Sequence, residues 1–89
     1  MYAIITVTGQ DHTGIVAAVA TELARNKVNI HNVSQTIMDG FFTMILHVAF
    51  DEEQLDTAAL RDALRSVEED QDLVIRIQSD ALFTAVNEI

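Results

Sequence analysis

Hydrophobic and polar residues alternate along this chain with two periods, one typical of strands and the other typical of helices. Four runs are either β-branched and apolar or strictly alternating, and they predict strands over residues 2–8, 29–38, 41–50 and 73–78. Two runs carry apolar side chains at helical spacing and predict helices over residues 12–26 and 53–69. A short terminal helix is expected after Ser79 or Asp80, with Leu82, Phe83 and Val86 on its apolar side.

The dipeptide Asp39-Gly40 predicts a two-residue hairpin, because a type I′ turn needs positive φ at both positions. The turn sets the register, so Met38 should face Phe41 and Val33 should face Leu46. One face of the hairpin is then apolar and is expected to be the core face, with Val33, Ile37, Phe42, Met44, Leu46, Val48 and Phe50. The other face is half polar and carries Asn32, Ser34, Thr36, Thr43, Ile45 and His47.

The element order is strand, helix, strand, strand, helix, strand, which predicts an α+β, ferredoxin-like βαββαβ fold. Right-handed crossovers in both halves give a four-stranded antiparallel sheet of order 4-1-3-2, with two helices on one face. Residues 2–8 are apolar on both faces, as expected of a central strand, while residues 29–38 form an edge.

That edge strand carries no charge, no Lys and no Pro along about ten residues. Natural edges are usually blunted by such residues, because unpaired backbone groups attract another strand. We therefore expect a homodimer joined edge to edge through residues 29–38. The alternative geometry packs the half-polar sheet faces together around Ile45.

The stretch from Gly9 to Val16 joins the first strand to the first helix and is the most informative part of the chain. Asp11 or Thr13 is expected to cap the helix by accepting a backbone hydrogen bond. Gly14 leaves the first-turn N–H groups open, and these groups together with the helix dipole suit a carboxylate or phosphate.

Composition narrows the classes of function. The 89 residues predict one domain over residues 1–89, and the net charge of −9 would repel the phosphates of nucleic acids and anionic membranes. The chain has no Cys, no apolar run long enough for a membrane span and no basic leader, so a cytoplasmic protein is expected. The acidic run of residues 68–72 is interpreted as a solvated loop.

Neither a metal site nor an active site is predicted. His12, His31 and His47 lack ligand-like spacing, and simple alternation points His31 and His47 to opposite faces. No nucleophile has a base in a recognisable arrangement, so no catalytic residue, cofactor or metal is assigned and the protein is not expected to be an enzyme.

The motif Gly9-x-Asp11-x-x-Gly14-Ile15-Val16-Ala17-x-Val19, followed by Leu23-Ala24 and Val28-Asn29-Ile30, resembles the signature of ACT domains. ACT domains are small regulatory modules of amino-acid metabolism. The later Ser34-Gln35-Thr36 and Asp39-Gly40-Phe41-Phe42-Thr43-Met44 are similar to small stand-alone ACT proteins of bacteria and archaea, which are related to the glycine cleavage system regulator. Thr13 stands where many family members carry proline.

The resemblance implies a homodimer that senses a small-molecule effector, an amino acid above all, and acts on a regulated protein partner. The implied ligand site lies between the first turn of one subunit and the second strand of its neighbour. Its residues are Gly9, Gln10, Asp11, His12, Thr13, Gly14, Ile15 and Val16, with Asn29, Ile30 and His31. Two alternatives remain open: an interaction or dimerisation module without a ligand, and a metal-responsive sensor.

Overall fold

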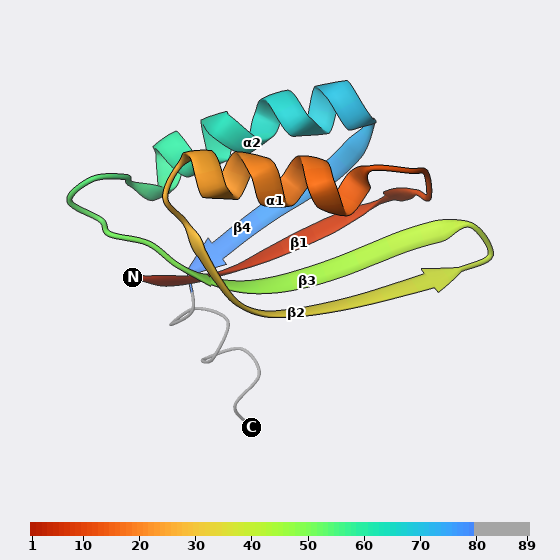
Figure 1. Ribbon diagram of the computed structural model, residues 1–89, viewed down its shortest axis with the longest axis horizontal. Coiled ribbons are helices and arrows are strands. Elements are labelled where there is room, and N and C mark those ends of the chain that lie inside the picture. Colours follow the sequence, from red (N-terminus) through yellow and green to blue (C-terminus); the bar gives the residue numbers. More distant parts are fainter. Residues whose placement is uncertain (80–89) are drawn as a thin grey trace.

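A computed structural model describes residues 1–79 of the chain and contains two helices and four strands (Figure 1). The elements are β1 (Tyr2–Gln10), α1 (Ile15–Arg25), β2 (Asn29–Met38), β3 (Phe41–Ala49), α2 (Thr57–Gln71) and β4 (Leu73–Ser79). The terminal helix predicted after Ser79 lies outside the described residues. Neither described helix has the length and apolar character needed to cross a membrane.

The four strands form one antiparallel sheet of order β2-β3-β1-β4, which confirms the predicted 4-1-3-2 order. Both helices lie on one face of this sheet (Figure 1). Ala3, Ile5 and Val7 of the central strand β1 are fully buried beneath them. The helices contribute Ile15, Val19, Leu23, Leu60 and Leu64 to the same core, so the fold is the predicted ferredoxin-like arrangement.

The hairpin between β2 and β3 has the predicted turn and register. Asp39 has φ +52° and Gly40 has φ +80°, as a type I′ turn requires. Met38 is opposite Phe41, and Val33 is opposite Leu46. The turn type and the pairing of the adjoining residues of β2 and β3 therefore follow from the Asp39-Gly40 dipeptide.

Both helices begin later than the apolar periodicity predicts, while α1 ends one residue earlier, at Arg25, and α2 ends two residues later, at Gln71. Helix α2 begins at Thr57 because Asp56 is its N-cap, with Oδ1 accepting from the Ala59 N–H at 2.7 Å. The acidic residues 51–53 belong to a preceding turn instead, where Asp51 accepts from the Glu53 N–H at 3.0 Å. The prediction that residues 68–72 form a loop is wrong for residues 68–71, which belong to α2.

Strand β2 is much more exposed than the other strands. Val33 and Ile37 lie on the helix side of the sheet, yet 49% and 54% of their surfaces are exposed. Their partners in β3, Leu46 and Phe42, are each 2% exposed. The expectation that this whole face is core is therefore wrong at Val33 and Ile37, because the helices cover β3 but not β2.

Candidate functional site

The turn between β1 and α1 is held between two other turns at one end of the molecule (Figure 1). The Asp11 N–H donates to the Gly40 carbonyl of the hairpin at 2.8 Å. On the other side, His12 Nε2 lies 2.9 Å from the Gln71 carbonyl at the end of α2. These two contacts give the polar loop a defined position although its side chains are exposed.

Gly9 lies within β1, between Phe42 of β3 and Leu73 of β4. A Cβ atom built on Gly9 would lie 2.7 Å from Leu73 Cδ2 and 3.2 Å from the Asp72 carbonyl oxygen. Gly9 is thus needed for close approach of β4 to β1, and the chain turns only after Gln10.

Gly14 is the N-cap of α1 and has φ +94°, a left-handed conformation that favours glycine. No side chain among the described residues caps this helix, so the prediction that Asp11 or Thr13 does so is wrong. The reason is that Gly14 itself occupies the N-cap position, and glycine has no side chain that could accept a hydrogen bond. The first-turn amides consequently lack a side-chain acceptor, which leaves them available to an anionic group.

The side chains of the first turn differ in what they can offer a ligand. Ile15 is 2% exposed and belongs to the core, so only its backbone can face a ligand. Val16 is 44% exposed and lies beside the open amides. Gln10, Asp11 and Thr13 are exposed, and each can present a polar group at the surface.

His12 stabilises the turn. Its two ring nitrogens lie 3.1 Å from the Thr13 carbonyl and 2.9 Å from the Gln71 carbonyl. Carbonyl oxygens only accept, so both bonds form when the ring is doubly protonated. These bonds, with the Gln71 carbonyl contributing most, raise the pKa of His12 above its usual 6.5. The cation also lies at the C-terminal end of α2, which favours positive charge.

We expect His12 to make the stability of this protein pH-dependent. Because the pKa of His12 is higher in the folded chain, its contribution is complete below about pH 6.5 and is lost as pH rises through the folded-state pKa. The free-energy gap between wild type and His12→Ala in urea unfolding should therefore shrink from pH 5.5 to pH 8.5. An NMR titration midpoint for His12 at or below 6.5 would contradict this assignment.

The second part of the predicted site, Asn29 to His31, lies at the other end of the molecule. Asn29 and Tyr2 both pair with Ala49, whereas Gly9 pairs with Phe42. Ala49 and Phe42 are seven residue steps apart along β3. At the rise of an extended strand, this corresponds to about 23 Å. Within one chain, the structure therefore does not bring Asn29, Ile30 and His31 to the first turn.

The prediction that His31 and His47 point to opposite faces is wrong. Ile30 pairs with Val48 and Asn32 pairs with His47, so His31 is the extra residue of a β-bulge. The bulge interrupts the alternation and brings the His31 ring to the face opposite the helices. There its centroid lies 6.0 Å from that of His47 and 5.3 Å from that of Tyr2. Ile30, by contrast, packs against the core, and Asn29 is exposed.

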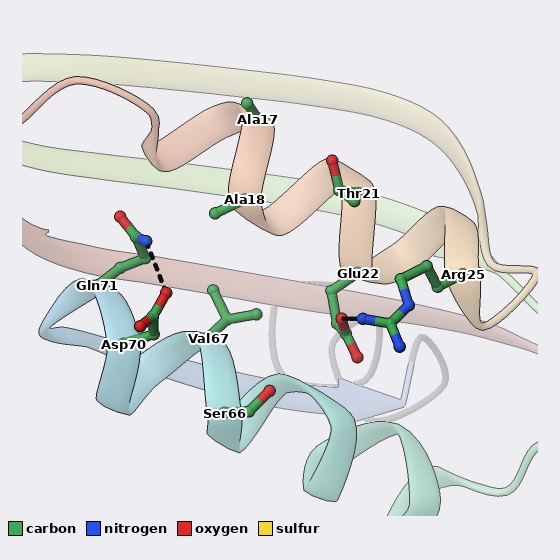
Figure 2. Close-up of a pocket in the computed structure, with 9 residues that line it drawn as sticks. All are labelled: Ala17, Ala18, Thr21, Glu22, Arg25, Ser66, Val67, Asp70 and Gln71. Carbon is green, nitrogen blue, oxygen red and sulfur yellow. Dashed lines mark hydrogen bonds and ion pairs between the residues drawn. The ribbon is translucent and has the colours of Figure 1, made fainter.

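An open groove of about 570 Å³ lies between α1 and α2. Figure 2 shows Ala17, Ala18 and Thr21 of α1 on one side and Ser66 of α2 on the other. These short side chains leave the space, and a 3.3 Å ion pair between Glu22 and Arg25 lies toward one end. Sequence reasoning missed the groove, for which the run of small residues on α1 was the available signal.

ACT domains share this split βαββαβ sheet with two helices on one face. The chain belongs to this family, since the ACT domain family model matches residues 1–78. Its relatives include a UPF0237 protein of Corynebacterium glutamicum. The two sequences are 70% identical over 89 residues, which cover the whole of each chain.

Solved structures agree with this assignment. An ACT domain protein from Streptococcus pneumoniae is 43% identical, with a TM-score of 0.82 over 93% of each chain. A protein assigned as a glycine cleavage system transcriptional repressor has a TM-score of 0.77 at 18% identity, covering 86% of this chain and 44% of that one. The second likeness shows a shared fold.

Proposed function

We propose that this protein is a regulatory module that works as a homodimer and binds a small effector, most naturally an amino acid. Membership of the ACT family supports regulation by a small molecule. The observation that carries the proposal is the open N-terminus of α1, where Gly14 caps the helix without any side-chain acceptor. Such a terminus accepts an anionic group, and the α-carboxylate of an amino acid is one.

The dimer forms through β2, which is an edge of the sheet in residues 1–79. Its outer backbone groups face no strand within residues 1–79, and it carries no charged side chain. A second copy paired there would also cover Val33 and Ile37, which lie on the helix side without a helix above them. An exposed, uncharged edge with an uncovered apolar face favours pairing with a second copy.

Antiparallel pairing of two β2 strands completes the proposed site. Strand β2 runs from Asn29, at the far end of the molecule, to Met38, at the end that holds the first turn. A two-fold axis through the paired strands reverses the partner. Asn29 of one subunit then comes to the same end as Gly14 of the other, and two equivalent sites form per dimer.

The two halves of the site offer complementary chemistry to an amino acid. The open amides of residues 15–17 would take the α-carboxylate. Exposed carboxylate or amide oxygens, on Asp11 or on the neighbour's Asn29, would accept from the ammonium group. His12 contributes by holding the turn, because its two nitrogens already face carbonyl groups.

A thermal-shift screen against the twenty amino acids tests this proposal. A ligand present at ten times its Kd should stabilise the folded state by about 1.4 kcal/mol. For a domain of this size, that free energy corresponds to a rise in Tm of roughly 5–10 °C. If no amino acid raises the Tm at millimolar concentration, amino-acid sensing by this chain is refuted.

Gly14→Leu should abolish the shift produced by any ligand found in that screen. The new side chain has open space around it, but it would cover the amides and force leucine into φ +94°. Gly40→Leu is the matched control, because Gly40 also has open space and φ +80°. The control should keep the ligand shift despite similar strain. A ligand shift that survives in Gly14→Leu would place the site elsewhere.

A further inference from the structure

Three aromatic rings from three different strands meet on the sheet face opposite the helices. They belong to Tyr2 of β1, His31 of β2 and His47 of β3, and we call them the ring cluster. Tyr2 is equidistant from the two imidazoles, with its centroid 5.3 Å from each, so the three rings form a triangle. The two imidazole centroids are 6.0 Å apart. His31 is exposed and His47 is half-buried, so the cluster opens to solvent on the His31 side.

The ring cluster exists because of an irregularity in β2. Without the extra residue at His31, alternation would send this imidazole toward the helices. The bulge instead places His31 and Asn32 in succession on the outer side, and regular pairing with β3 resumes at Asn32. Bulges often re-aim a single side chain next to a functional site.

The separation of the two imidazoles suits a shared metal ion. A nitrogen ligand lies about 2.0–2.1 Å from zinc, which places the ion about 3.2 Å from the centroid of the ring that binds it. Two imidazoles on one tetrahedral ion then have centroids about 5.2 Å apart. The separation can reach at most about 6.4 Å, when the two rings lie on opposite sides of the ion. The observed 6.0 Å is inside that limit, and a closing movement of less than about 1 Å gives tetrahedral angles.

We infer that His31 and His47 form a two-imidazole site for a divalent transition-metal ion such as Zn²⁺, Ni²⁺ or Cu²⁺. Neutral imidazole is the nitrogen ligand that these ions prefer. Within residues 1–79, no group of three His, Cys, Asp or Glu could hold an ion. The ion therefore keeps its remaining positions for water or for a ligand from another molecule. The net charge of −9 raises the local concentration of cations around the protein.

This metal site is distinct from the proposed effector site, although His31 occurs in both sets of residues. The ring cluster is on the sheet face away from the helices, whereas the effector site uses the helix N-terminus at Gly14. Metal binding can thus be measured with the metal alone. Gly14→Leu should leave metal binding unchanged, which separates failure of one proposal from failure of the other.

Calorimetric titration of the full chain, prepared without a histidine tag, with ZnCl₂ and separately with NiCl₂ tests the site. We expect one ion per chain and a loss of at least tenfold in affinity for His31→Ala and for His47→Ala. His12→Ala is the matched control, because His12 is an exposed histidine at the other end of the molecule and faces two carbonyls. It should bind as wild type does.

NMR provides a second readout that does not depend on the substitutions. Diamagnetic Zn²⁺ should shift the ring resonances of His31 and His47 and leave those of His12 in place. Absence of saturable binding, or equal affinity in wild type and both cluster variants, would overturn the site. Loss of binding in His12→Ala together with Zn²⁺ shifts at His12 would do the same.

Discussion

A Gln35→Pro variant should be a monomer at micromolar concentration, where we expect the wild-type chain to be a dimer. In a two-residue hairpin, the residues next to the turn exchange both backbone hydrogen bonds, so the Met38 N–H points to β3. N–H directions alternate along a strand, and the Gln35 N–H therefore points away from β3 to the open edge. Proline at this position removes an N–H from the proposed interface and leaves the ladder with β3 unchanged.

The expected effect is large because two-fold symmetry doubles it. Each subunit loses one interface hydrogen bond, worth about 1 kcal/mol, and the proline ring also obstructs the approaching strand. The two lost hydrogen bonds alone raise the dissociation constant about 30-fold, since each 1.4 kcal/mol is a factor of ten, and the obstruction by the ring raises it further. Light scattering and sedimentation would measure it, and Gln35→Ala, which keeps the N–H, is the matched control.

An Ile45→Glu variant distinguishes the two dimer geometries. Ile45 is 43% exposed on the face opposite the helices, so a charge there would break a dimer packed face to face. We expect this variant to remain a dimer. A wild-type chain that is already monomeric would contradict both geometries. A dimer lost in Ile45→Glu but kept in Gln35→Pro would support face packing instead.

Gly9→Val should destabilise the fold by about 2–3 kcal/mol, near the upper end of the range for overpacked interiors. The new Cβ would be 2.7 Å from Leu73 Cδ2 and 3.2 Å from the Asp72 carbonyl oxygen. The leucine side chain can move, but it is 7% exposed and has little free space, and the carbonyl belongs to the backbone. Strand β4 must therefore shift away from β1.

Chemical denaturation would measure this loss as a lower midpoint with an unchanged slope. Thr8→Val is the matched control, because it introduces a β-branched apolar residue one position earlier on the same strand. Thr8 is only half-buried, so its replacement should change stability little. Equal stability of Gly9→Val and wild type would show that Gly9 is not required for the approach of β4.

The hairpin and the sheet order could be predicted from sequence because their causes are local or topological. Asp39-Gly40 determines the turn type, and the turn determines which residues of β2 and β3 are opposite each other. Hydrophobic periodicity predicted both helices but missed their first residues. The reason is that apolar spacing does not distinguish Asp51 from Asp56 as the N-cap of α2.

The first turn shows what a sequence motif can and cannot indicate. The motif places Gly9 and Gly14 together in one turn, whereas the structure places Gly9 within β1 and Gly14 at the N-cap of α1. Gly9 is required by the proximity of Leu73, which is 64 residues further along the chain, and no local pattern contains that contact. His12 similarly contacts Gln71, so its raised pKa depends on where α2 ends.

By itself, the sequence determined the element order, the central position of β1 and the uncharged edge at β2, because these depend on residue type and spacing. Tertiary structure alone decided that Val33 and Ile37 are uncovered, since this depends on how far the helices extend over the sheet. It also decided that His31 joins His47 and Tyr2. One extra residue in a strand reverses the direction of a side chain, and its position depends on pairing with β3 rather than on the hydrophobic pattern of β2.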